Sequence, residues 1–174
     1  LDGLQAFLDD PARARLLPSP DALPFERIAW DPATREQRLA TLAALERWSA
    51  DPRSSPPVVV ATARGLMTRT IPRATFAGSL IRLAPGRRTR VTDLMRSLVA
   101  LGYEPQTAVS EPGHMAHRGG IADVYVPSES MPARIEWMGD EIESLRWFDP
   151  ASQRSLAAAE EVTLVPAREA LPAA

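Results

Sequence analysis

The sequence contains no cysteine and no lysine. Without cysteine the chain can form neither disulfides nor thiolate metal sites, which is typical of a protein from the reducing cytoplasm. All 20 basic residues are arginine, and 17 residues are proline. This bias indicates a GC-rich genome rather than a demand for guanidinium chemistry. The 22 acidic residues leave a net charge of −2, so the chain as a whole is not suited to bind nucleic-acid phosphates.

Long apolar runs are also missing. No run approaches the length of a membrane span, and no basic and apolar leader opens the chain, so we expect a soluble protein without a secretion signal. The chain begins with Leu1 rather than Met, which suggests a piece of a longer protein. Its 174 residues, 45% hydrophobic and 24% charged, suffice for one large domain or two small ones, each with its own core.

Catalytic motifs are absent from the sequence. It has no G-x-x-x-x-G-K-[ST] phosphate loop and no G-x-G-x-x-G dinucleotide loop. The two histidines, His114 and His117, are three residues apart in a predicted strand, where that spacing places them on opposite faces. An acidic cluster at a predicted hairpin turn is more typical of solvated side chains than of acid–base catalysis; it comprises Asp140, Glu141 and Glu143. We therefore expect no catalytic residues, no metal and no cofactor.

The first half, residues 1–72, alternates helices, loops and strands. Leu4–Leu8 predicts the end of a helix, and Ala14–Leu17 predicts a short strand. Asp31 is a suitable N-cap for a helix that continues to residue 48 with an apolar stripe. The β-branched run Val58–Ala61 is typical of a strand buried on both faces of a parallel sheet. This half is predicted to be an α/β domain.

In the second half, residues 73–168, the period at which apolar residues recur changes. A strand is predicted at Ser79–Leu83, followed by a helix that Thr89 caps and Gly102 closes. The apolar positions expected to face inward are Val91, Leu94, Met95, Leu98 and Val99. Further strands are predicted at Thr107–Val109, Met115–Arg118, Ile121–Val126, Ala133–Met138, Glu141–Phe148 and Val162–Val165. Turn residues between them favour an antiparallel meander with one packed helix, an α+β module. Residues 169–174 are a tail.

Arginines and aromatic residues recur along these predicted strands. The arginines are Arg118, Arg134 and Arg146, and the aromatic residues are Tyr125, Trp137, Trp147 and Phe148. Arginine beside exposed aromatic side chains is typical of a protein-binding hot spot. Alternatively, the aromatic side chains form the core and the arginines lie in solvent. The spacing favours neither interpretation.

Three blocks in the second half have the order and spacing of a known family. They are Arg118–Asp123 (RGGIAD), Arg134–Arg146 (RIEWMGDEIESLR) and Phe148–Ser155 (FDPASQRS). Together they resemble the region shared by the transcription-repair coupling factors (Mfd) and the excision nuclease subunit UvrB. The third block is similar to the coupling factors. A weaker resemblance extends through residues 23–26, 35–48 and 58–72, so that nearly the whole chain is covered.

The resemblance implies that residues 1–72 are part of a degenerate helicase-like domain that binds no ATP. It implies that residues 73–168 are a UvrA-interaction module similar to domain 2 of UvrB. The function implied is non-catalytic: recruitment of UvrA in the bacterial cytoplasm, which links stalled RNA polymerase to nucleotide excision repair. The ATP- and magnesium-dependent translocase, and the contacts with RNA polymerase and DNA, would belong to other regions of the parent protein.

The resemblance also implies the contact residues. Arg118, Arg134 and the second member of an aromatic pair face UvrA in the family. Here that pair is Trp137–Met138, so an adaptable apolar methionine replaces the second aromatic residue. The Pro127–Pro132 loop is predicted to join Ile121–Val126 to Ala133–Met138 as a hairpin, which places Arg118 and Arg134 toward the same part of the sheet. We therefore expect them to form one exposed basic patch. Two alternatives are UvrB itself, which would need an aromatic-rich DNA-loading hairpin, and a free-standing nucleic-acid-binding domain, which would need a basic stripe.

Overall fold

The computed structural model describes residues 2–20 and 30–169, which form two compact units. The first unit ends at Ala77 and the second begins at Gly78. The sequence had placed this division between residues 72 and 73. The later position has a physical cause, because helix α4 (Arg73–Gly78) is tied to the long helix α2 (Pro32–Ala50). Arg73 Nε lies 3.1 Å from Glu46 Oε2, and Phe76 of α4 is buried.

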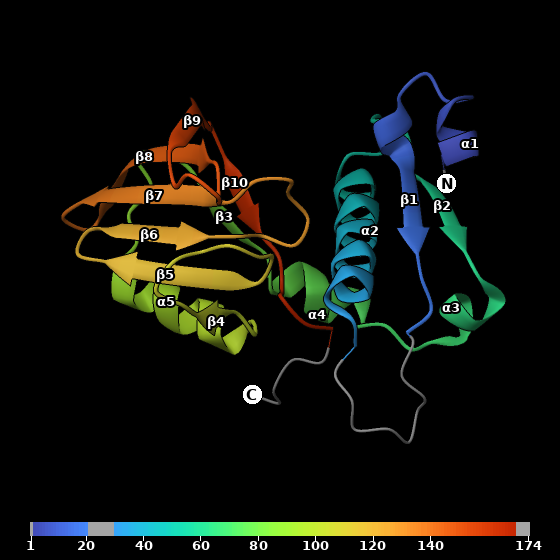
Figure 1. The fold of residues 1–174 in the computed structure, drawn as a ribbon, viewed down its shortest axis with the longest axis horizontal. Coiled ribbons are helices and arrows are strands. Elements are labelled where there is room, and N and C mark those ends of the chain that lie inside the picture. The colour runs from blue at the N-terminus through green and yellow to red at the C-terminus, as the bar shows by residue number, and fades with distance from the viewer. Residues whose placement is uncertain (1, 21–29, 170–174) are drawn as a thin grey trace. The chain divides into compact units, whose positions relative to one another are not determined.

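The first unit contains a two-stranded parallel sheet and a long helix (Figure 1). Its helices are α1 (Asp2–Gln5), α2 (Pro32–Ala50), α3 (Ala63–Met67) and α4, with a 3-10 turn at Pro11–Arg13. Its strands are β1 (Ala14–Leu17) and β2 (Val58–Ala61), which pair in parallel from Ala14↔Val58 to Leu17↔Ala61. The predicted bounds of both strands are confirmed, whereas α1 ends before Leu8.

Helix α2 begins where its capping residue predicts. The carboxylate of Asp31 accepts a hydrogen bond from Thr34 N at 3.0 Å, which satisfies one of the amides left free at a helix start. Along the helix, Leu39 is fully buried and Thr41 Oγ1 donates to Leu16 O of β1 at 2.8 Å. The buried guanidinium of Arg38 donates to Pro18 O just beyond β1. These contacts fix α2 on the strand.

The expectation that β2 is buried on both faces is wrong for the described part of the chain. All four of its residues are only half-buried. The physical reason is that the described sheet of this unit holds two strands, so β2 has one strand neighbour instead of two. The β-branched run Val58–Val60 indicated the strand but not its environment.

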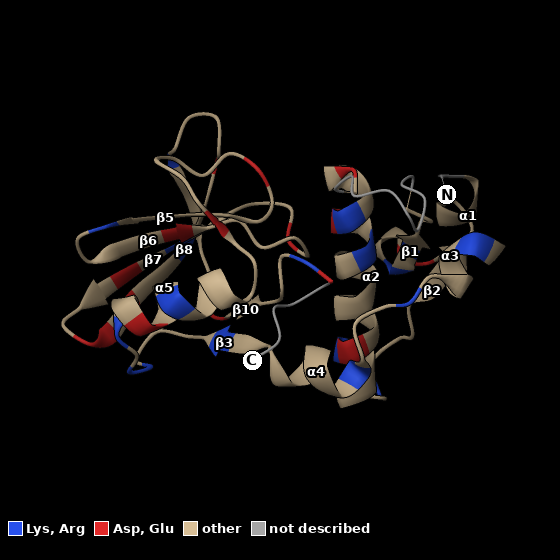
Figure 2. Ribbon diagram, turned by 90° about the horizontal axis from the view of Figure 1, so that it is seen from below, with Lys and Arg blue, Asp and Glu red and all other residues tan. Residues whose placement is uncertain are grey.

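The second unit is built on a six-stranded sheet. Its strand order is β4-β5-β6-β7-β8-β9, antiparallel except for the parallel pair β4-β5. These strands are β4 (Glu104–Pro105), β5 (His114–Arg118), β6 (Ile121–Val124), β7 (Ala133–Met138), β8 (Glu141–Phe148) and β9 (Ser155–Ala158). Strand β3 (Ile81–Leu83) pairs separately with β10 (Val162–Leu164). Helix α5 (Val91–Ala100) lies across one face of the large sheet (Figures 1 and 2).

The predicted meander with one helix is confirmed from β5 to β8, with local corrections. The strand expected at Val162–Val165 lies outside the meander, because β10 pairs with β3. Residues Thr107–Val109 form no strand; the short β4 precedes them instead. Strand β9 was not predicted, because its four residues are all exposed and show no alternation. In α5, Leu94 and Leu98 are buried as expected, but Val99 is 56% exposed. The residue before the helix is Arg90, without a side-chain cap, so Thr89 does not cap it.

The core of the second unit lies between the sheet and α5. From the sheet it contains Met115, Ala122, Val124, Ile135, Trp137, Ile142 and Leu145, all buried. The helix contributes its buried leucines, Leu94 and Leu98. Because side chains alternate along a strand, Arg118, Arg134 and Arg146 lie on the opposite face, away from α5. We call that opposite face the outer face.

Candidate functional site

The outer face is organised by strand register, because directly paired residues project on the same side of a sheet. Arg118 of β5 pairs with Ile121 of β6, which pairs with Glu136 of β7. In the next row along the strands, Asp123 pairs with Arg134, which pairs with Arg146 of β8. Three arginines from three strands, β5, β7 and β8, therefore share this face.

Arg118 lies at the end of β5 and is exposed. Its Nη2 donates to Thr107 O at 2.5 Å, which leaves the rest of the guanidinium open to solvent. The neighbouring Ile121 is 40% exposed. This corner of the outer face thus combines an accessible cation with accessible apolar surface.

Arg134 is held in place by the residue opposite. Its Nε and Nη2 donate to the two carboxylate oxygens of Asp123 at 2.7 and 2.8 Å, and its Nη1 donates to Gln153 O at 3.3 Å. The guanidinium also lies 4.7 Å from the centroid of the Phe148 ring. The hydrogen bonds to Asp123 raise the pKa of Arg134 above its ordinary value. Paired carboxylate and planar guanidinium form a strong and geometrically specific contact.

The expectation that Arg118 and Arg134 form one exposed patch is therefore wrong for Arg134. The side chains of Arg134 and Asp123 are only 21% and 14% exposed. The sequence placed Arg134 on the correct strand, but it gave no register, and register is what sets Asp123 directly opposite. Arg118 is the accessible member of the two.

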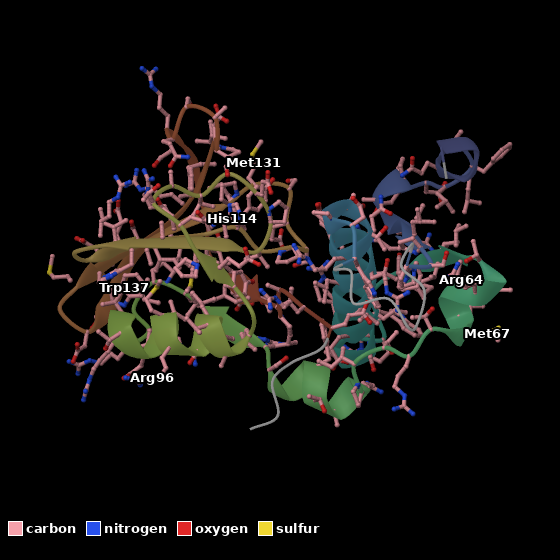
Figure 3. All side chains as sticks on the ribbon, turned by 60° about the horizontal axis from the view of Figure 1, so that its bottom comes forward. Arg64, Met67, Arg96, His114, Met131 and Trp137 are labelled. Carbon is pink, nitrogen blue, oxygen red and sulfur yellow. The ribbon has the colours of Figure 1, made fainter. Side chains whose placement is uncertain are left out.

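Trp137 and Met138 lie on opposite sides of the sheet. A register shift between Glu136 and Trp137 marks a β-bulge, and Trp137 then pairs with the buried Ile142. Trp137 is 9% exposed, and its Nε1 donates to Thr89 O at 2.9 Å, between the sheet and α5 (Figure 3). Met138, in contrast, is 69% exposed. Of this pair only Met138 presents its side chain for contact.

The aromatic residues that accompany the arginines are largely core. Phe148 is fully buried with Val109 and Ala116, and Tyr125 packs against this cluster. Trp147 is half-buried. The structure thus supports the interpretation in which the aromatic side chains build the domain, and it leaves the exposed arginines and Met138 as the accessible groups.

The FDPASQRS block forms a tightly bonded loop. The sequence predicts a turn at Asp149–Pro150 but not the hydrogen bonds that hold the loop. Asp149 accepts from Ala151 N at 3.0 Å and from Ser152 Oγ at 2.7 Å, and these bonds lower the pKa of Asp149. Gln153 adopts a φ of 59°, unusual for a residue other than glycine, and its Nε2 donates to Val109 O. The turn chemistry of Asp-Pro-x-Ser was a usable signal. The loop supports Arg134 and leads into β9.

Other candidate groups are dispersed. Within residues 2–20 and 30–169, no three histidine or carboxylate side chains gather in a way that could hold a metal ion. His117 Nε2 lies 2.7 Å from Gly119 O and is thereby occupied locally. None of the helices in the described part of the chain has the length and apolarity that a membrane crossing requires. Acidic and basic residues are interspersed over the second unit (Figure 2).

Comparisons with known proteins agree with these features. A family model described as the UvrB interaction domain matches residues 81–169, which include every strand of the outer face. The chain is 36% identical to the transcription-repair-coupling factor of Myxococcus xanthus over 91% of its length. The transcription-repair-coupling factors of Bacillus subtilis (strain 168) and Escherichia coli (strain K12) are 30% and 31% identical over 97% and 86% of the chain. The chain spans 12–14% of the length of these relatives. It belongs to the UvrB interaction domain family.

Proposed function

We propose that the second unit is a docking module for the excision-repair protein UvrA, and that UvrA binds the outer face. The observation that carries this proposal is the exposure of Arg118 and Met138 on one face of a domain whose aromatic residues are otherwise used for packing. Membership in the UvrB interaction domain family and similarity to transcription-repair-coupling factors support the choice of partner.

The composition of this face suits a protein contact. Arg118, Ile121 and Met138 combine a guanidinium with accessible apolar area, and arginine and methionine are both enriched at interfaces. Arg118 lies two strands away from β7, which corresponds to about 10 Å across the sheet. One partner surface can therefore reach both. Arginine suits the cationic role because its fork can bind a carboxylate through two hydrogen bonds.

Arg134 and Trp137 have supporting roles in this proposal. Arg134, bonded to Asp123 and Gln153, keeps β6, β7 and the Asp149–Ser155 loop in a fixed arrangement. Trp137 anchors β7 to the segment before α5 through Thr89, so that Met138 next to it is held outward. Substitution of either residue would weaken UvrA binding indirectly, by disturbing the face rather than by removing a contact.

The wider proposal concerns the longer protein. Residues 1–72 would be part of a degenerate helicase-like domain that binds no ATP, and residues 73–168 would be the UvrB domain 2-like module. The parent would be a coupling factor that links stalled RNA polymerase to nucleotide excision repair. Its ATP, magnesium, DNA and RNA polymerase contacts would lie in other regions. The missing phosphate loop and the absence of lysine support a non-catalytic chain.

Calorimetric titration of UvrA with variants of the chain tests the proposal. Arg118→Ala should weaken binding roughly tenfold or more, the typical loss for a hot-spot arginine. Arg118→Glu should weaken it further by repulsion. The matched control is Arg96→Ala on α5, an exposed arginine on the other side of the sheet, which should bind as the parent does. Parent-like binding by both Arg118 variants would show that the binding face has been misplaced.

A further inference from the structure

Arg146 stands directly opposite Arg134 in the β7–β8 pairing. Two like charges in this position repel each other, and such pairs destabilise a sheet. Arg134 is compensated by Asp123 on its other side. Arg146 is exposed, and in residues 2–20 and 30–169 no carboxylate or carbonyl bonds to its guanidinium. Its other neighbour in the row is Ala158 of β9, which offers no charge.

We propose that Arg146 is a second cationic contact of the outer face for an acidic protein surface, and that Arg134 is the positioning residue between the two cations. The identity of the partner as UvrA rests on the proposed function above. Arg146 and Arg118 both have exposed side chains, and neither has a carboxylate partner among the residues that the structure describes. Arg134 is already satisfied by Asp123, so an incoming carboxylate would gain little from it.

The register gives the spacing that the partner must match. Arg118 and Arg146 are separated by three strand-to-strand steps, and Arg146 lies two residues along β8 from Ser144, the residue in the row of Arg118. With a strand spacing of about 4.8 Å and a rise of about 3.4 Å per residue, their Cα atoms are roughly 16 Å apart. The two guanidiniums therefore require two separate acidic groups.

The residues between the cations restrict what can bind. Asp123 is paired with Arg134, and Glu136 accepts a hydrogen bond from Ser144 Oγ at 2.6 Å. An acidic group placed over the centre of the face would meet these two carboxylates, whereas one at either end meets a cation. Such repulsion contributes to specificity. A nucleic-acid backbone carries closely and evenly spaced phosphates, so the pattern favours a folded acidic protein surface.

Unfolding and binding experiments on the full 174-residue chain separate this role from a structural one. Arg146→Ala should weaken UvrA binding about tenfold, as expected for loss of a charged contact, and Arg146→Glu should weaken it more. The melting temperature of Arg146→Ala should equal or exceed that of the parent, because repulsion with Arg134 is removed. Arg146→Lys should retain more affinity than Arg146→Ala. Arg82→Ala, an exposed arginine in the separate β3–β10 sheet, is the control and should leave binding unchanged.

Four results would overturn the inference. If Arg146→Ala and Arg146→Glu both bind UvrA with the affinity of the parent, the proposed contact of Arg146 is refuted, whereas the proposed function is not. A lower melting temperature that accompanies the lost affinity of Arg146→Ala would make the residue structural. Loss of duplex DNA binding at low salt, with UvrA binding unchanged, would assign the residue to nucleic acid instead. If the parent chain does not bind UvrA at all, both the proposed function and the proposed contact of Arg146 are refuted.

Discussion

The Asp123–Arg134 pair gives the sharpest stability prediction. Arg134→Ala would remove a two-pronged ion pair, a hydrogen bond to Gln153 O and a ring contact with Phe148. It would also leave the carboxylate of Asp123, only 14% exposed, without its partner. An exposed ion pair contributes about 0–1 kcal/mol, whereas breaking a buried pair costs about 3–5 kcal/mol. The partial exposure places this pair between those limits, so we expect a loss of about 2 kcal/mol.

The expected change in melting temperature follows from the size of the unit. For a domain of 60–100 residues, a loss of 1 kcal/mol lowers the melting temperature by about 4–8 °C. Arg134→Ala should therefore melt roughly 10 °C below the parent. Circular dichroism during heating measures this shift. Arg146→Ala is the matched control. It removes an arginine from the same row of the sheet, but this arginine makes no hydrogen bond or ion pair with the residues that the structure describes.

A double-mutant cycle isolates the pair itself. Asp123→Ala, Arg134→Ala and the double variant should show a coupling free energy of about 1–2 kcal/mol, in the range observed for residues in contact. The double variant should be more stable than the two single losses predict, because neither charge is left unpaired. A coupling near zero, or a melting temperature of Arg134→Ala equal to that of the parent, would refute the assignment of Arg134 as a residue that holds the outer face together.

Individual residues and the sequence give four further predictions. Met138→Phe should preserve or strengthen UvrA binding and Met138→Asp should weaken it, with an unchanged dichroism spectrum, because Met138 is 69% exposed. Tyr103 is fully buried and donates to Val165 O, and burial raises its pKa. Its contribution to stability is thus complete below the unfolded pKa of about 10 and is lost as pH rises above it. An alkaline absorbance titration should show Tyr103 ionising only as the domain unfolds. Calorimetry should detect no micromolar ATP binding, and duplex DNA should bind only weakly at physiological salt; a nanomolar DNA complex with a shallow salt dependence would contradict this.

The elements with clear periodicity could be predicted from the sequence, and those without it could not. Strands β7 and β8 alternate buried and exposed residues over much of their length, and their bounds were predicted correctly. The Asp31 cap fixed the start of α2. Strand β9 was not predicted, because none of its residues is buried. Its sequence therefore lacks the alternation of apolar and polar residues that would indicate its pairing with β8.

The candidate site was only partly predictable, for reasons of register. The sequence identified Arg118, Arg134 and Met138, but exposure depends on which residue lies opposite. Asp123 faces Arg134 only because of the β6–β7 register. By contrast, the simple alternation of β7 places Trp137 in the core and Met138 outward, because the extra residue of the bulge, Glu143, lies on β8 and leaves the alternation of β7 intact.

A photo-crosslinking experiment tests most directly whether UvrA binds the outer face. A photoreactive amino acid is placed at Met138, which is exposed on the outer face, and in a second variant at Val99, which is 56% exposed on α5 across the sheet. With purified UvrA, irradiation should produce a crosslink from position 138 and none from position 99, and Arg118→Glu should abolish the crosslink. A crosslink from position 99 alone, or equal crosslinks from both positions that persist in Arg118→Glu, would contradict the proposed outer-face contact.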